Sequence, residues 1–221
     1  MAALKKILSW MLPVKVASYK GEISPVLEVT IENGVKVLNA GRVNYSFGAL
    51  HTVFQEGFRK IRLEKDPPSS VLILGFGVGS ITKIIREEYH FDCPITAVEA
   101  DEMIITIGKE HFDTVKIPKL ELIHARAEEF IRTNTKQFDL IAVDIFVEEE
   151  VPESCKTEEF LTALRNALTE KGKVVFNEMP APHSGEDVFE KRFRKIFPEL
   201  IIHEIQLGDA PNRIFIGSKE K

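Results

Sequence analysis

From Val71 to the end of the chain, short apolar runs alternate with segments in which apolar residues recur every three or four positions. This alternation is typical of βαβ units and predicts a parallel sheet flanked by helices. We predict strands at residues 71–74, 95–99, 120–124, 138–144 and 173–177. We predict helices at residues 80–89, 102–111, 127–133 and 157–169, and another at 186–197, before Pro198.

Two further strands, at residues 201–205 and 213–217, flank the turn-forming segment 208–212, which predicts a closing antiparallel hairpin. The predicted class is therefore α/β. We expect a Rossmann-like, seven-stranded, mostly parallel sheet with helices on both faces and this hairpin at one edge.

The first part of the chain follows another pattern. Residues 26–31 and 35–38 flank Asn33-Gly34, which is the strongest short signal for a β-hairpin. Residues 1–16 predict a short amphipathic helix, because Pro13 and Lys15 interrupt the apolar run before it could span a bilayer. A proline- and serine-containing linker at 66–70 then separates an N-terminal extension, residues 1–65, from an α/β domain, residues 66–221.

Composition excludes some classes of partner. The net charge is -5 and the pI is about 5.8, so the chain has no basic excess to attract nucleic acid or an anionic membrane. The two cysteines, Cys93 and Cys155, lie in no metal-binding or redox motif, so we expect reduced thiols, no metal and a cytoplasmic location.

A glycine-rich turn follows the first strand of the predicted α/β domain. Gly75-Phe76-Gly77-Val78-Gly79 has G-x-G-x-G spacing, and glycines there let the backbone turn tightly and approach a ligand. Dinucleotide sites use G-x-G-x-x-G instead, and Ser80 stands where their third glycine would be, which argues against a nicotinamide enzyme. Two interpretations remain open: a nucleoside-binding loop and a purely structural turn.

An acidic residue ends the second predicted strand. Glu99 follows Gly79 by 20 residues, and a carboxylate at that place accepts hydrogen bonds from both ribose hydroxyls. The alternative is an ordinary acid at a helix start, although Asp101 already suits the N-cap position.

With these motifs, the sequence resembles the spermidine synthase family and its methyltransferase relatives over residues 27–177. The resemblance implies that residues 71–79 hold the amino-acid or aminopropyl portion of a nucleoside ligand. It also implies that residues 98–101, which include Glu99, Ala100 and Asp101, hold ribose.

Residues 123–130 resemble the adenine-binding segment of that family. Arg126 stands where the family has an aspartate that accepts from the adenine amino group. Because arginine can only donate, the Ala127 backbone would carry more of the recognition.

Asp144 ends the 138–144 strand, at the edge where open α/β sheets bind ligands. In the family that the chain resembles, this aspartate orients or deprotonates the attacking amine, which must lose a proton before displacement at carbon. The alternative is that Asp144 caps the following turn. The family's second aspartate is replaced by Val147, and Glu148 is a candidate substrate-binding residue unless the run 148–150 is simply a solvated acidic segment.

The segment ahead of the glycine loop resembles the family's lid. Asn44 lies near the place of a ligand-touching glutamine and is a candidate substrate-binding residue. Tyr45, a candidate catalytic residue, and His51 could gate or assist the pocket, and packing or an incidental surface position is the alternative for each.

We therefore expect a transferase that uses S-adenosylmethionine or its decarboxylated form and delivers a methyl or aminopropyl group to a small amine-like acceptor. The corresponding nucleoside products are S-adenosylhomocysteine and methylthioadenosine. The alternative is a nucleoside-binding or interaction protein of the same fold that lost turnover, because Arg126 and Val147 replace acids. The resemblance also implies a homodimer built through the N-terminal hairpin.

Overall fold

The computed structural model describes residues 6–40, 43–44, 49–147, 150–179, 187–207 and 210–220. Two separate sheets organise this part of the chain. No helix within it is long and apolar enough to cross a bilayer.

The larger sheet has seven strands in the order β10-β11-β9-β8-β5-β6-β7. The strands are β5 (Val71–Leu74), β6 (Ile95–Glu99), β7 (Leu120–His124), β8 (Phe138–Val143), β9 (Leu168–Glu178), β10 (Ile201–Leu207) and β11 (Ala210–Ser218). The five strands from β9 to β7 are parallel, while β11 is antiparallel to both β9 and β10. The predicted fold class and the closing hairpin are confirmed.

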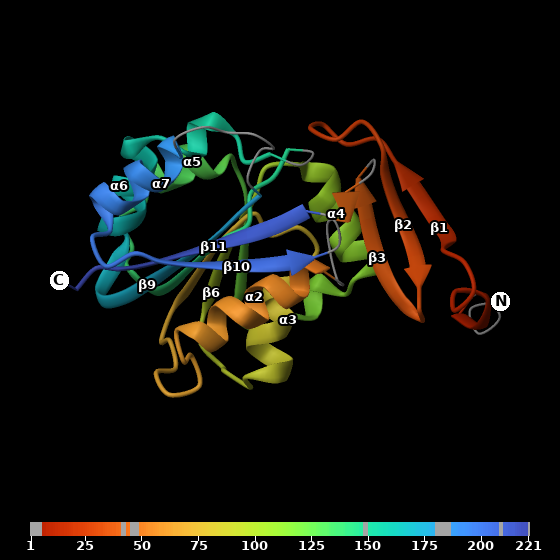
Figure 1. Ribbon diagram of the computed structural model, residues 1–221. Coiled ribbons are helices and arrows are strands. Elements are labelled where there is room, and N and C mark those ends of the chain that lie inside the picture. Colours follow the sequence, from red (N-terminus) through yellow and green to blue (C-terminus); the bar gives the residue numbers. More distant parts are fainter. Residues whose placement is uncertain are drawn as a thin grey trace.

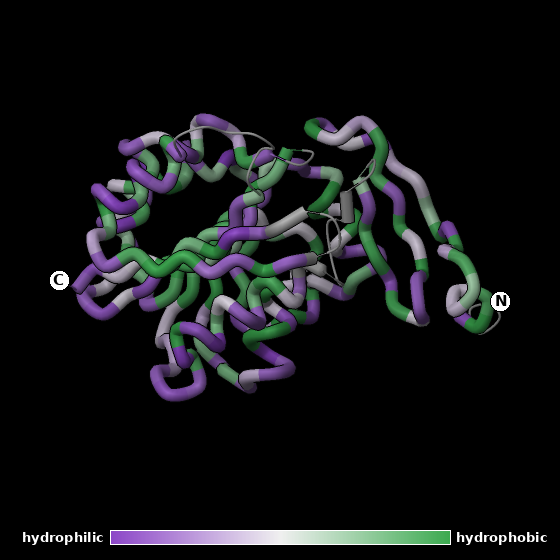
Figure 2. Tube along the Cα trace, in the orientation of Figure 1, coloured by the Kyte–Doolittle hydropathy of each residue, from purple (hydrophilic) through white to green (hydrophobic). Residues whose placement is uncertain are grey.

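Helices cover both faces of this sheet (Figure 1). On one face lie α2 (Ala49–Lys60) and α3 (Ser80–Lys83), which continues into a π-helical turn, η1 (Ile84–Glu88). On the other face lie α5 (Ala127–Thr133), α6 (Glu158–Asn166) and α7 (Val188–Ile196). Figure 2 shows the apolar residues concentrated in the strands between these layers, as expected for parallel strands that are buried on both sides.

The smaller sheet is antiparallel and consists of β1 (Val14–Tyr19), β2 (Leu27–Glu32), β3 (Val35–Ala40) and β4 (Val43–Asn44). The predicted hairpin is confirmed, and its two turn residues, Asn33 and Gly34, both have positive φ. The sheet packs through Leu27 and Leu38 against Ile107 of α4 (Glu102–His111) and against Val78 of the glycine loop. It therefore lies beside the candidate nucleoside site.

Several predicted elements differ from the structure in their bounds. The helix expected at residues 157–169 ends at Asn166, because β9 begins at Leu168 and Ala167 accepts a hydrogen bond from the Phe138 amide. The N-terminal helix expected at residues 1–16 is wrong at its end: residues 6–8 are helical, and Val14 begins β1 by pairing with Ile31. The strand expected to include Asp144 ends one residue earlier, at Val143.

No element was predicted for α2. Its Val53, Phe54 and Phe58 are buried against the large sheet together with Ile73 and Val175. A division of the chain at residue 65 would assign α2 to the N-terminal extension, although its packing partners belong to the large sheet. The division itself stays a prediction.

Candidate functional site

The glycine loop leaves β5 directly beside Asp144. Gly75 has a φ of 87°, and a Cβ there would lie 2.1 Å from the carbonyl oxygen of Asp144. Only glycine fits this contact between two backbone segments. Gly79 has a φ of 94° and precedes α3, while the Phe76 ring is buried in the core, so Phe76 offers a ligand only its backbone.

Glu99 connects the end of β6 to the same loop. Its Oε2 accepts from the Gly77 amide at 2.8 Å, and its Oε1 accepts from the amides of Ala100 and Asp101 at 2.9 and 3.1 Å. Burial raises the pKa of Glu99, and these three backbone hydrogen bonds oppose that rise. A carboxylate has about four acceptor positions, so about one remains for a ligand hydroxyl.

Asp101 is engaged within the protein. Its side chain is fully buried, and Oδ1 accepts from the Met103 amide, which makes Asp101 the N-cap of α4. Its Oδ2 accepts from the Ile23 amide at 3.0 Å, in the segment between β1 and β2. Asp101 therefore connects the small sheet to the α/β body.

The candidate adenine segment lies at the start of α5. Arg126 is more than half exposed, and its Nε donates to Oε1 of Glu128 at 2.9 Å. Ala127 is buried, so this position can offer a ligand its backbone amide in the first turn of the helix.

Asp144 follows β8 and meets the neighbouring strand β9. Its Oδ1 accepts a hydrogen bond of 3.0 Å from Nδ2 of Asn177. Burial raises the pKa of Asp144 to about 6, and the Asn177 amide opposes that rise. A carboxyl group with this pKa is ionised at neutral pH and can still accept a proton from an amine near it.

The segment after Asp144 turns back tightly. Val147 and Glu150 exchange two backbone hydrogen bonds, and both side chains are exposed. Glu148, the candidate substrate-binding acid, lies outside the described residues.

The candidate lid is described only in part. Asn44 lies in β4 and pairs with Asn39, and Tyr45 lies outside the described residues. His51, in the first turn of α2, contacts Oγ of Ser80 through Nδ1 at 3.1 Å and Oε1 of Glu88 through Nε2 at 2.6 Å. His51 therefore connects α2 to the residue that follows the glycine loop.

Asn177 and Glu88 were not singled out in the sequence. A signal was present for Asn177, which is a polar residue directly after the apolar run Val174-Val175-Phe176. Glu88 gave no such signal, because its contact with His51 depends on how α2 packs against η1.

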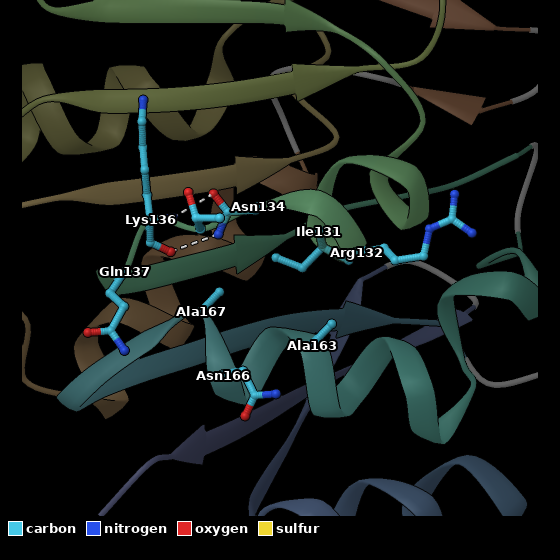
Figure 3. A pocket seen from close by; sticks show the side chains of 9 residues that line it. Ile131, Arg132, Asn134, Lys136, Gln137, Ala163, Asn166 and Ala167 are labelled. Atoms are coloured by element: carbon cyan, nitrogen blue, oxygen red, sulfur yellow. Dashed lines mark hydrogen bonds between the residues drawn. The ribbon is translucent and has the colours of Figure 1, made fainter.

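A separate hollow lies at the opposite edge of the sheet (Figure 3). Asn134, Lys136 and Gln137 line it immediately before β8, and Ala167 lines it immediately before β9. Ligands of open α/β sheets bind at the carboxyl ends of the strands, so this hollow is not the candidate site.

Comparison with known protein families shows one match. The model of the spermine/spermidine synthase domain matches residues 51–199, which is more than half of the chain. The chain belongs to the spermine/spermidine synthase family.

One similar protein is the polyamine aminopropyltransferase of Alkaliphilus metalliredigens, which is 26% identical over 152 residues. The match covers 65% of this chain and 53% of the relative, so the chain spans about half of the length of that relative. The family membership confirms the resemblance found in the sequence.

Solved structures agree on the fold. A probable spermidine synthase from Corynebacterium glutamicum has a TM-score of 0.78 at 18% identity, and the match covers 93% of this chain and 81% of that one. Human methyltransferase-like protein 13, solved with SAH, has a TM-score of 0.67 at 18% identity and covers 79% of this chain and 83% of that one. Within the spermine/spermidine synthase family, this chain therefore has the fold that is shared with class I methyltransferases.

Proposed function

We propose that this protein transfers an aminopropyl group from decarboxylated S-adenosylmethionine to a small amine-like acceptor. The observation that carries the proposal is the position of Asp144. Its backbone packs against Gly75 of the glycine loop, and its carboxyl group has a pKa raised to about 6. A proton acceptor thus lies beside the loop that would hold the reactive end of the donor.

The residues present fit the donor in the following way. The Gly75 and Gly79 backbone would support the aminopropyl tail, and the remaining acceptor position on Glu99 would take one ribose hydroxyl. A second hydroxyl would require one of the three backbone amides to release Glu99. The adenine would lie at the start of α5, where the Ala127 amide can donate, while Arg126 already pairs with Glu128.

The proposed transfer involves the donor, the acceptor amine and Asp144. The neutral amine nitrogen attacks the propyl carbon that is bonded to the sulfonium sulfur, and the new C–N bond forms as the C–S bond breaks. The electron pair of the broken bond stays on sulfur, so methylthioadenosine leaves as a neutral thioether. The proton lost by the amine goes to the Asp144 carboxylate and then to solvent.

The test is product formation. The protein is incubated at pH 8 with decarboxylated S-adenosylmethionine and a panel of mono-, di- and triamines, and mass spectrometry detects methylthioadenosine together with the aminopropylated amine. We expect paired, stoichiometric products that disappear in Asp144→Asn. Donor that binds in calorimetry and yields no product with any amine would overturn the proposal.

A methyl transfer is the second candidate, and the fold shared with methyltransferases favours it. The same panel with S-adenosylmethionine distinguishes the two reactions, because methyl transfer yields S-adenosylhomocysteine and an acceptor heavier by one methylene. A binding protein without turnover is the third candidate. Val147 and the engaged Arg126 support it, since neither can replace an acid.

The acceptor site, the location and the assembly belong to the same proposal. Asn44 and Glu148 stay candidates for contacts with the acceptor, and Tyr45 stays a candidate catalytic residue. The cytoplasm stays the proposed location. A homodimer through the small sheet is tested by light scattering, and a monomer mass at micromolar concentration would reject it.

A further inference from the structure

Asn177 is a buried amide in the apolar strand β9. Its side chain is fully inaccessible to solvent, and its strand neighbours Val174, Val175 and Phe176 are buried and apolar. In the sheet register Phe176 pairs with Val143, so Asn177 comes level with Asp144, where β8 ends. The register therefore explains why the two side chains meet.

The orientation of the Asn177 amide is fixed by chemistry. An ionised carboxylate can only accept hydrogen bonds, so the Asn177 NH₂ group must face Oδ1 of Asp144. The Asn177 carbonyl oxygen then points away from Asp144, and it has no hydrogen-bond partner in the part of the chain that the structure describes.

This arrangement is unfavourable for stability. A buried amide oxygen without a partner costs about 1–3 kcal/mol, and a valine or isoleucine at this position in a parallel strand would avoid that cost. The packing of β9 therefore gives no reason for asparagine at position 177. Its contact with Asp144 does.

We infer that Asn177 is a positioning residue that fixes one oxygen of the Asp144 carboxylate and leaves the other oxygen to receive the proton of the attacking amine. This inference rests on the proposed function of Asp144. Asn177 would both orient the Asp144 carboxylate and lower the pKa of Asp144 by its hydrogen bond.

Other charged groups near this edge have partners of their own. Glu178, the next residue on β9, points to the opposite face of the sheet and pairs with Arg213. On α2, which packs against β9, His51 contacts Ser80 and Glu88. Beyond β5, on β6, Glu99 accepts from the backbone of the glycine loop. Within the described chain, burial and the Asn177 amide are the two influences on the pKa of Asp144.

The test measures the acidity of Asp144 directly. The carboxyl groups are labelled with ¹³C and titrated by NMR in the wild type and in Asn177→Leu, which keeps the number and branching of the side-chain heavy atoms, and Asp144→Asn assigns the signal. One hydrogen bond to a charged group is worth about 1.5–3 kcal/mol, so the pKa of Asp144 should rise by about one unit or more. The acidic limb of the pH profile of kcat/KM, which reports the groups of the free enzyme, should move in the same direction.

Asn212 provides a matched control. It is a buried asparagine on β11 whose carbonyl oxygen also has no partner among the described residues, and no contact with Asp144 is present. Asn212→Leu should leave the pKa of Asp144 unchanged. Asn177→Val, which matches the neighbouring strand residues, replaces Asn177→Leu if the leucine variant does not fold.

The outcomes are separable. An unchanged Asp144 pKa in a folded Asn177 variant overturns the inference, as does an equal shift in Asn212→Leu. If the wild type forms no product while the Asn177 variant still shifts the pKa of Asp144, the proposed function fails. The inference that Asn177 positions the Asp144 carboxylate is then still supported.

Discussion

The Gly77 amide donates a 2.8 Å hydrogen bond to Oε2 of Glu99 and thereby joins the glycine loop to the end of β6. The other oxygen of Glu99 holds the two amides that begin the next turn. One buried carboxylate thus sets the shape of both segments that would contact the donor. Loop geometry and ribose recognition should therefore be lost together when Glu99 is changed.

Replacement of Glu99 by glutamine tests this coupling. The glutamine oxygen can still accept hydrogen bonds from the amides of Ala100 and Asp101. The glutamine NH₂ group would then face the Gly77 amide, and two donors cannot form a hydrogen bond with each other. We expect Glu99→Gln to weaken methylthioadenosine binding by about tenfold or more in calorimetry. It should also speed hydrogen exchange of the Gly77 amide.

The control for this variant is Glu121→Gln on the neighbouring strand β7, where the glutamate is exposed and pairs with Lys136. Its affinity for methylthioadenosine should equal that of the wild type. Wild-type affinity in Glu99→Gln would show that Glu99 is a structural residue alone.

Gly75→Ala should be the most damaging single change in the loop. The new Cβ would meet the Asp144 carbonyl oxygen at 2.1 Å, and the φ of 87° is unfavourable for alanine. We expect a loss of more than about 3 kcal/mol of unfolding free energy, measured by urea denaturation.

A matched glycine separates the clash from the backbone conformation. Gly34 has a φ of 79°, and its added Cβ would meet only the flexible ends of Lys6 and Trp10, at 3.3 Å or more. Gly34→Ala should therefore cost only about 1–2 kcal/mol, which is the cost of the left-handed conformation. Equal losses in the two variants would contradict the assignment of the Gly75 contact.

Asp144 should be destabilising in its ionised form. Its folded pKa of about 6 lies above the ordinary value of 3.8, so the folded chain binds the proton more tightly than the unfolded chain does. The ionised carboxylate therefore costs up to about 3 kcal/mol above pH 6, and this cost disappears as the pH falls from 6 toward 3.8.

We therefore expect Asp144→Asn to lose turnover and yet to unfold at a higher temperature than the wild type at pH 8. The difference should shrink below pH 6, as followed by thermal denaturation over a pH series. Asp66→Asn removes an exposed ion pair with Lys173 and should change neither turnover nor the unfolding temperature. A less stable Asp144→Asn at pH 8 would contradict the unfavourable burial of the charge.

The sequence predicted the strand ends that position the site, because buried parallel strands appear in the sequence as apolar runs. Glu99 is the last residue of β6, and Asp144 directly follows β8. It did not predict α2, whose apolar residues Val53, Phe54 and Phe58 have helical spacing around Gly57. Glycine normally argues against a helix interior. Here a Cβ on Gly57 would lie 2.8 Å from Val175, so close packing on the sheet explains the glycine.

The partners of the site residues could not be predicted for a related reason. The contact between Asn177 and Asp144 depends on the register of β9 against β8, which shifts between Phe138 and Leu140. Single-chain patterns give strands and faces, whereas register across two strands depends on tertiary packing.

The contact between α2 and the segment after the glycine loop should depend on pH through Glu88. Oε1 of Glu88 meets Nε2 of His51, and Oε2 accepts from Gln55. Since a carboxylate only accepts, His51 donates through Nε2. Burial acts to raise the pKa of Glu88, and the hydrogen bonds from Gln55 and His51 outweigh it, so the pKa lies below the ordinary value of 4.5.

A lowered pKa means that Glu88 stabilises the fold above pH 4.5 and loses this effect as the pH falls through its folded pKa. We expect Glu88→Gln to be less stable than the wild type in urea denaturation at pH 7 and equal to it once both are measured below that pKa. Glu87→Gln, at the neighbouring residue whose exposed side chain lies 3.8 Å from Lys83, should match the wild type at each pH. Protonation removes the charge of Glu88 and leaves its shape unchanged. If the difference in unfolding free energy between the wild type and Glu88→Gln stayed constant down to the lowest pH at which both fold, the effect would come from shape rather than from charge.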